Sequence, residues 1–331
     1  MEIIDIDLAD PAMRRDFFAV ETEVVRHDVP GAWERSYESF EKFAMQPDGR
    51  YNRRFRFGAL VDGRLAGTVE MWHPLEDNTH LADVSIAVRP QARGGGVGSA
   101  LMGRVEQICA AHGRTTLVGE LDVPVGQDFR TTPGGAFATG RGFESVHTED
   151  QLVLDLPADT AALAQAAARA TAGYEIVLWG DRCPDEHVAG FCAMRTQMSS
   201  DVPTGGIDVQ PVAFDEERLR TGEQHRANGW TSIVAAAVRR HDRIMGGYSM
   251  LRLPHGGDLV AQDDALVMPE HRGHRLGTAL KLATLDVVRR EHPERRAVHT
   301  WTEPSNHAMQ RTNRDFGYQP RSVLHKMQRK R

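Results

Sequence analysis

The residues best placed to do chemistry form a glycine-rich loop that leads directly into an amphipathic helix. An apolar segment ends at Val88, and the loop that follows contains Arg93, Gly94, Gly95, Gly96, Val97, Gly98 and Ser99. Free N–H groups at the start of a helix carry partial positive charge and bind anions. Glycine lets a phosphate approach the backbone, and an arginine adds a charged fork. The segment therefore predicts a phosphate-binding loop.

A second loop of the same plan follows 179 positions further on. Val267 ends the preceding apolar segment, and the loop contains Arg272, Gly273, His274, Arg275, Leu276 and Gly277. Arg275 stands where the first loop has Gly96, so we expect weaker phosphate binding here. No third ligand stands at a metal-binding spacing from His271 and His274, so no metal site is predicted.

Two other nucleotide loops fit this pattern less well. A Walker loop requires a lysine after its last glycine, and none lies between Val88 and Leu101. A dinucleotide fingerprint must follow its strand directly and end in glycine, whereas Pro90 to Arg93 intervene here and Ser99 takes the last position. Glu120 matches the ribose-binding acid of that fingerprint only loosely, so the dinucleotide interpretation is the weaker alternative.

Short motifs recur in the same order in both halves, which indicates two tandem domains. Asp28-Val29-Pro30-Gly31 recurs as Asp201-Val202-Pro203-Thr204, Leu65-Ala66-Gly67 as Ile244-Met245-Gly246, and Gly142-Phe143 as Gly317-Tyr318. Apolar spacing predicts helices over 97–112 and 276–290 after strands that end at the two loops. We expect an N-terminal domain over residues 1–156, a helical linker over 157–173 and a C-terminal domain over 174–331.

The shared loop pattern resembles the acetyl-CoA pyrophosphate loop of the GNAT superfamily of N-acetyltransferases. Residues Arg93 to Gly98 match its Arg/Gln-x-x-Gly-x-Gly/Ala core, and the second copy departs from it at Arg275. The tandem arrangement is similar to that of two-domain acetyltransferases related to mycothiol synthase. The resemblance implies an α/β fold of two GNAT-like domains, each a twisted mixed β-sheet flanked by helices, with acetyl-CoA as co-substrate.

The resemblance also implies how such a site works. The strand before each loop separates from its neighbour, and a backbone N–H near Val88 or Val267 polarises the thioester carbonyl. A primary amine of a small molecule attacks the thioester directly, after a general base has removed its proton. The candidates on these strands are Asp83 and Asp264, with Asp263, Glu70 and Glu120 as weaker choices.

Two further positions follow from the family pattern. Asn306 lies where members often have an asparagine near the cofactor. Ala138 and Asn313 stand where many members have a tyrosine that protonates the leaving thiolate, so neither half carries that acid. Because the tyrosine is absent, a CoA-binding sensor or scaffold without catalysis is the alternative to an enzyme.

Composition limits the remaining classes. The 331 residues carry a net charge of −6, which does not favour a nucleic-acid partner, and no apolar run has the roughly 18 residues of a membrane span. The three cysteines, Cys109, Cys183 and Cys192, are too few for a disulfide framework, so we expect a cytoplasmic protein. Residues 1–155 have a net charge of −9 and the rest +3, which reflects either surface drift or attraction of a cationic substrate.

Overall fold

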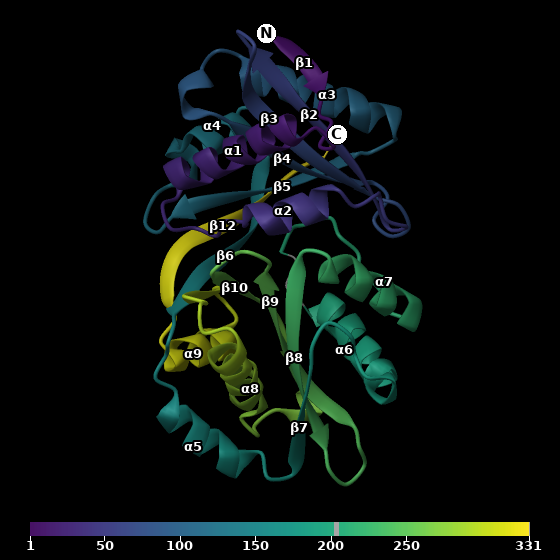
Figure 1. The fold of residues 1–331 in the computed structure, drawn as a ribbon, viewed down its shortest axis with the longest axis vertical. Helices are drawn as coiled ribbons and strands as arrows, with labels where there is room; N and C mark the ends of the chain where they lie inside the picture. Colours follow the sequence, from purple (N-terminus) through teal and green to yellow (C-terminus); the bar gives the residue numbers. More distant parts are fainter. Residues whose placement is uncertain (202–204, 331) are drawn as a thin grey trace. The chain divides into compact units, whose positions relative to one another are not determined.

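The computed structural model describes residues 1–201 and 205–330, which form two compact units (Figure 1). Unit 1 contains residues 1–150, a short segment that ends at Gln210, and the C-terminal residues from Arg321. Unit 2 contains the residues from Gln151 to Pro320 outside that segment. These units differ from the predicted division at residue 156, because the last strand of the chain pairs within unit 1.

Unit 1 is a mixed sheet with helices. Its strands have the order β1-β2-β3-β4-β5-β12, and β4 and β5 are parallel. Its elements are β1 (Glu2–Asp5), α1 (Pro11–Asp28), α2 (Tyr37–Ala44), β2 (Asn52–Val61), β3 (Arg64–Pro74), β4 (Leu81–Val88), α3 (Val97–Ala111), β5 (Thr116–Pro124), α4 (Pro133–Thr139) and most of β12 (Gln319–Lys330). The start of β6 (Glu144–Asp155) also belongs to this unit.

Unit 2 repeats this plan. Its strands have the order β11-β10-β9-β8-β7, and the end of β6 pairs beside β11. Its elements are α5 (Ala161–Ala170), β7 (Tyr174–Trp179), α6 (Val188–Asp201), α7 (Glu216–Ala227), β8 (Trp230–Arg239), β9 (Met245–Pro254), β10 (Leu259–Val267), α8 (Leu276–Glu291), β11 (Ala297–Thr302) and α9 (His307–Phe316). The predicted linker helix exists as α5, and it packs on α8 as part of unit 2.

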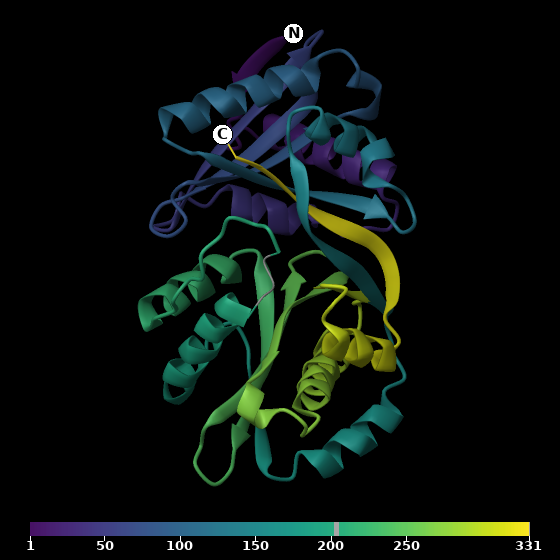
Figure 2. The same ribbon diagram turned by 180° about the vertical axis from the view of Figure 1, so that it is seen from behind.

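Helices cover both faces of each sheet (Figures 1 and 2). In unit 1, Phe17 of α1 and Phe40 of α2 pack with Ala87, while Leu101 and Val105 of α3 pack with the opposite face. In unit 2, α6 and α7 lie on one side of the sheet and α8 on the other. The prediction of two mixed sheets flanked by helices is therefore confirmed.

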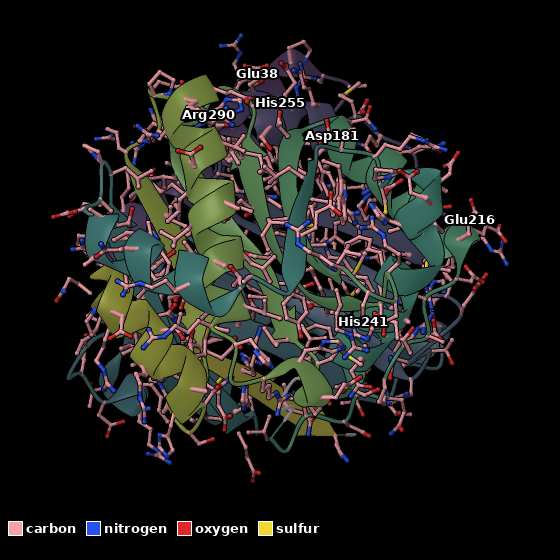
Figure 3. All side chains as sticks on the ribbon, turned by 90° about the horizontal axis from the view of Figure 1, so that it is seen from below. Glu38, Asp181, Glu216, His241, His255 and Arg290 are labelled. Carbon is pink, nitrogen blue, oxygen red and sulfur yellow. The ribbon has the colours of Figure 1, made fainter. Side chains whose placement is uncertain are left out.

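Glu216 on α7 and Arg290 on α8 are charged side chains on the outer sides of the unit 2 helices (Figure 3). The apolar stripe of α8 faces the sheet, as its spacing predicted, through Leu280, Val287 and Val288. Within the described ranges, no helix is both long and apolar enough to cross a membrane.

Strand pairing corrects one of the aligned motifs. Gly67 pairs with Val88 at the end of β4, and Gly247 pairs with Val267 at the end of β10. Gly67 therefore corresponds to Gly247, one position later than the predicted Gly246. A Cβ at either glycine would meet the carbonyl oxygen of the facing strand at 2.9 Å, which explains why both positions are glycine. Of the Asp201-Val202-Pro203-Thr204 motif, only Asp201 lies inside the described residues.

Candidate active site

The predicted phosphate loop of unit 1 opens α3 as expected. Gly94 and Gly96 have φ values of 76° and 84°, which an L side chain adopts only under strain, and nothing lies within 4 Å of a Cβ at either position. Ala100 donates the first helical bond, to Gly96 O at 3.0 Å. The N–H groups of Val97, Gly98 and Ser99 consequently have no partner in the helix, and such groups are able to bind an anion.

Arg93 braces this loop and does not reach toward the helix end. Its two terminal nitrogens each bond Asp28 at 2.8 Å, and its Nε donates to Val88 O at 3.1 Å. The Arg93 guanidinium and the side chain of His27 hold the pKa of Asp28 below its usual range, although partial burial opposes them. Asp28 ends α1, so the pair fixes the strand end and the loop to that helix. The expected phosphate fork is therefore not formed by Arg93 in this structure.

Arg141, which sequence reasoning missed, supplies a positive charge beside the helix end. Its Nη2 donates to Ser99 Oγ at 2.5 Å, and its guanidinium carbon lies 4.6 Å from the centre of the Phe137 ring. A Cβ on Gly98 would lie 2.9 Å from the Phe137 ring, so the absence of a side chain at residue 98 leaves room for this ring. The signal in the sequence was the position of Arg141 directly before Gly142: Arg141 belongs to the repeated motif, but no role in binding was predicted for it.

The two parallel strands of unit 1 separate beyond Asp83. The β4–β5 pairing ends with Asp83 opposite Val118. The strands still approach closely at the next residues, where Val84 O lies 2.8 Å from where a Gly119 Cβ would be, and the notch begins after this point. Arg89 N donates to Ala66 O on β3 at 2.9 Å. Because a strand alternates the direction of its N–H groups, Ile86 and Val88 turn theirs toward the notch. A bound carbonyl oxygen would find its donor here.

A cavity of about 890 Å³ joins the notch to the glycine loop, and all of its lining belongs to unit 1. The cofactor-loop residues on its wall are Val88, Arg93, Gly94, Gly96, Val97, Gly98 and Ser99. Gly95 is exposed and lies outside this set. The predicted loop and the predicted splayed strands thus meet at one site.

Acidic groups gather on the face of the sheet that α1 and α2 cover. Asp83 lies between the core residues Ala82 and Val84, so its side chain is on the opposite face of the sheet. Glu120 and Asp122 are on that same face of β5, because they alternate with core-facing residues. Glu70, Glu120 and Asp122 line the cavity, and Asp83 lies directly before its lining residue Val84. The sequence identified Asp83, Glu70 and Glu120, but it missed Asp122.

Two of these carboxyl groups have raised pKa values. The atoms packed around Asp83, and next the charge of Glu120, raise its pKa to about 6, while water still reaches part of the side chain. Burial raises the pKa of Asp122 to about 6 as well, although a hydrogen bond of 3.1 Å from Ser322 Oγ opposes this shift. A carboxylate with a pKa near 6 is ionised at neutral pH, and it is a better proton acceptor than an ordinary aspartate.

Paired charges form the rest of this wall. Arg35 contacts Glu21 and lies 3.6 Å from Glu70, whose other oxygen accepts from Arg56 Nε at 2.6 Å. Burial raises the pKa of Glu21, and the Arg35 charge opposes that shift.

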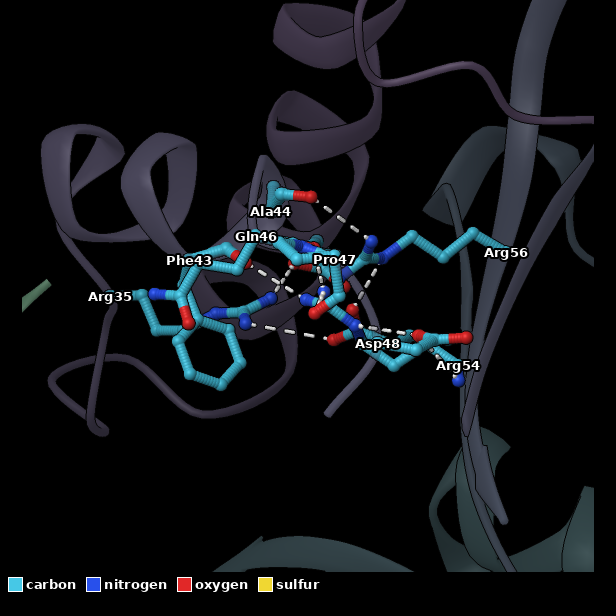
Figure 4. Close-up of polar contacts among 10 residues, drawn as sticks. Arg35, Phe43, Ala44, Gln46, Pro47, Asp48, Arg54 and Arg56 are labelled. Atoms are coloured by element: carbon cyan, nitrogen blue, oxygen red, sulfur yellow. Dashed lines mark hydrogen bonds and ion pairs between the residues drawn. The ribbon is translucent and has the colours of Figure 1, made fainter. Parts of the chain in front are cut away.

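Arg54 and Arg56 hold the end of α2 at the edge of this wall (Figure 4). Arg54 donates to Phe43 O at 2.8 Å and to Gln46 O, and Arg56 donates to Ala44 O at 3.4 Å. The arginines of β2 therefore position the segment that follows α2.

The C-terminal strand completes the site of unit 1. Lys326 of β12 contacts Glu120 and lies 3.8 Å from Glu149, and Met327 lines the cavity. No local sequence signal connects Lys326 to Glu120, which lies 206 positions earlier.

In the loop of unit 2, the arginine again contacts the end of the preceding strand and an aspartate, but the residue before the helix differs. Arg272 Nε donates to Val267 O at 3.1 Å and its Nη2 lies 4.0 Å from Asp201, as in the Arg93–Asp28 pair. Gly273 has a φ of 87°, and Arg275 adopts the left-handed conformation that Gly96 has in unit 1, with a φ of 52°. The other predicted loop residues are placed as follows: Leu276 lies in the core, the His274 ring is 5.7 Å from that of Tyr174, and Gly277 faces Val267.

The candidate base of unit 2 is already paired. Asp264 contacts Arg195 of α6 and accepts a hydrogen bond of 3.2 Å from Tyr248 OH. Burial, and next the charge of Asp263, raise the pKa of Asp264. Asp264 lies opposite Met250, as Ser85 lies opposite Glu70, so Asp264 corresponds to Ser85 and not to Asp83.

Asn306 caps α9 by accepting a hydrogen bond from Met309 N at 3.1 Å, and it is exposed. Its position at the helix start gives it a structural task. Ala138 lines the cavity of unit 1 at the position where the family often has its tyrosine acid.

Comparison with known proteins agrees with this geometry. The model of the acetyltransferase (GNAT) family matches residues 22–129 and 193–318, one stretch in each half and together more than half of the chain. The chain therefore belongs to the GNAT acetyltransferase family, whose members are acyltransferases that generally use acyl-CoA. Both the resemblance and the tandem fold predicted from the sequence are confirmed.

Several solved structures share the whole arrangement. A tandem GNAT protein from the clavulanic acid biosynthesis pathway is 25% identical with a TM-score of 0.83, and the match covers 99% of this chain and 98% of that one. A GCN5-related N-acetyltransferase from Sphaerobacter thermophilus is 16% identical with a TM-score of 0.67, with coverage of 99% and 95%, and shows the fold alone. Comparison with curated protein sequences gave no match.

Proposed function

We propose that the chain transfers the acetyl group of acetyl-CoA to a primary amine of a small molecule, in unit 1. One observation carries the proposal: a single cavity joins the helix-start loop, the open edge of β4 and a group of carboxylates. The loop binds the pyrophosphate through the N–H groups of Val97, Gly98 and Ser99. Arg141 adds a charge where Arg93 is already paired with Asp28.

The reaction follows from the positions of the groups. The pantetheine arm of acetyl-CoA, which carries the acetyl group and which we call the acyl-carrier arm, enters the notch beyond Asp83. The Val88 N–H stabilises the oxyanion that forms on the thioester carbonyl. The amine nitrogen bonds to that carbonyl carbon after its proton passes to Asp83, directly or through water. The C–S bond then breaks, the nitrogen releases its second proton to solvent as the amide forms, and CoA leaves as a thiolate, which solvent protonates because Ala138 carries no acid.

The acidic wall favours a cationic acceptor. Glu70, Glu120 and Asp122 line the cavity. Opposite charges raise the local concentration of such a substrate and lower the barrier to its approach.

The proposal is tested by incubating the full chain with acetyl-CoA and a panel of small amines and measuring release of free CoA thiol. Release that depends on both substrates, with the acetylated amine identified by mass spectrometry, supports the enzyme. Tight binding of acetyl-CoA without turnover of any amine would support the alternative, a CoA-binding sensor or scaffold, for which the missing tyrosines are the specific observation.

A further inference from the structure

The helices that follow the two glycine loops match residue by residue. Gly96 and Arg275 precede α3 and α8, and both have positive φ values. Val97 and Leu276 are buried first residues, and Leu101 and Leu280 are fully buried one turn later. The next position is Met102 in unit 1 and Lys281 in unit 2. Met102 lines the cavity of unit 1, whereas Lys281 is a lysine with 2% of its surface exposed.

The helices α4 and α9 match in the same way. Phe143 N donates to Ala138 O at 3.0 Å, and Tyr318 N donates to Asn313 O at 3.1 Å. The intervening glycines, at 142 and 317, have φ values of 80° and 92°. Ala138 thus corresponds to Asn313 and Phe143 to Tyr318. In the views of Figures 1 and 2, α9 lies beside α8.

The strands give a fourth pair. Leu81 pairs with Thr116 at the start of the parallel contact in unit 1, and Leu259 pairs with Ala297 in unit 2. Leu121 lies five residues after Thr116 on β5, and Thr302 lies five residues after Ala297 on β11. Leu121 also lines the cavity of unit 1.

All four positions are apolar in unit 1 and polar in unit 2, where their side chains interact with one another. Lys281 Nζ donates to Asn313 Oδ1 at 2.7 Å and lies 5.2 Å from the centre of the Tyr318 ring. Asn313 Nδ2 donates to Thr302 Oγ1 at 3.0 Å. Asn313 and Thr302 are buried, whereas Ala138 and Leu121 are half-buried beside the cavity. We call Lys281, Thr302, Asn313 and Tyr318 the lysine cluster.

We propose that the lysine cluster fills the space in unit 2 that corresponds to the notch of unit 1. The chain then binds one acyl-CoA, in unit 1. Lys281 is the residue that decides this specificity. An acyl-carrier arm entering unit 2 has to displace the amine from Asn313, and a buried amine that loses its partner is strongly destabilising. Burial lowers the pKa of Lys281 to about 7, and no carboxylate among the described residues offsets this shift. The proposal rests on the proposed binding of acyl-CoA in unit 1.

Calorimetric titration of the full chain with acetyl-CoA tests this proposal. We expect one site in the wild type, lost in Met102→Lys, which places the amine in the unit 1 notch. Met102→Leu is the matched control and keeps the site. Replacing the cluster with its unit 1 counterparts (Lys281→Met, Thr302→Leu, Asn313→Ala, Tyr318→Phe) together with Arg275→Gly is expected to add a second site, with folding checked by circular dichroism.

The opposite outcomes are distinct. Two sites in the wild type, or acetylation of Lys281 found by mass spectrometry, would mean that acetyl-CoA enters unit 2 and would overturn the proposal. A folded Met102→Lys variant that binds within about twofold of the wild type would overturn the role of the amine. One site with no turnover of any amine would reject the proposed catalysis while leaving this inference intact.

Discussion

Asp83 is the last residue of β4 that pairs with β5 before the notch opens, and this position explains its chemistry. Packed atoms raise its pKa while solvent still reaches it, so a proton can arrive from an amine and leave to water. Asp264 also has a raised pKa, but Arg195 and Tyr248 already bind its carboxylate, so it is not free to accept a proton from an amine. The same residue type on the corresponding strand thus has a different task in each unit.

We expect Asp83→Asn to lower kcat by about 10²-fold or more, the usual scale for loss of a general base, with the Kd for acetyl-CoA unchanged. In the wild type, kcat/KM should fall as the pH drops through about 6, because the base is active only when ionised. Steady-state kinetics from pH 5 to 8 and calorimetry measure both effects.

Asp122→Asn is the matched control, because Asp122 has the same raised pKa of about 6. If the acidic limb of the profile disappears in Asp122→Asn and persists in Asp83→Asn, then Asp122 is the base. Asp264→Asn should leave turnover unchanged, since the residue belongs to an ion pair of unit 2.

At the scale of elements, the start of each loop helix needs a left-handed residue. Gly96 provides it without strain, whereas Arg275 adopts a φ of 52° with a side chain attached. The left-handed conformation costs an L residue roughly 1–2 kcal/mol. The two loops therefore have the same backbone and different stability.

We expect Gly96→Ala to lower the free energy of unfolding by about 1 kcal/mol and Arg275→Gly to raise it by a similar amount. Nothing lies within 4 Å of a Cβ at residue 96, so the change reports on φ rather than on a clash. Urea denaturation measures it. Gly103→Ala is the control, since that site is equally open and lies inside α3; a loss of stability there as large as in Gly96→Ala would contradict the explanation.

Burial of Lys281 makes the stability of unit 2 depend on pH. Its pKa is about 7 in the folded chain against an ordinary value of 10.5, so between these values the unfolded state binds more protons. Stability contributed at this position therefore rises with pH across that window. Denaturant unfolding at pH 7 and pH 9.5 should show the wild type gaining relative to Lys281→Met. Equal pH dependence of the two proteins would show that Lys281 does not titrate in this range.

For the whole molecule, the decisive feature is that unit 1 includes the last strand of the chain. Residues 322–330 of β12 pair with 116–124 of β5, and Lys326 and Met327 contribute to the site. Neither half of the sequence contains a complete unit 1. This explains why a boundary drawn at residue 156 does not describe the folded units.

A chain truncated after Tyr318 should consequently lose acetyl-CoA binding and melt at a lower temperature, because β5 loses its partner strand and an unpaired edge remains. Circular dichroism and calorimetry measure the two effects. A synthetic peptide of residues 319–331 should restore part of the binding. Wild-type affinity in the truncated chain would show that β12 is not needed for the site.

The sequence by itself determined the family, the tandem repeat and the glycine loop. The arrangement Val88, Arg93, Gly94, Gly96 and Gly98 is local, because consecutive residues set the positive φ values and the helix start that follows. Periodicity also located α3 and α8 to within one residue of their observed ends. Local backbone conformation and apolar spacing depend on residues that are close together in the sequence, so they can be predicted without knowledge of the fold.

Only the tertiary structure decided which atoms meet. The pairing of Arg93 with Asp28, the pairing of Asp264 with Arg195, and the contact of Lys326 with Glu120 all join distant residues. The same is true of the lysine cluster, in which Met102, Leu121 and Ala138 give way to Lys281, Thr302 and Asn313. Single substitutions of this kind look unremarkable in sequence, since burial and hydrogen bonding depend on neighbours that only strand pairing and helix packing bring together.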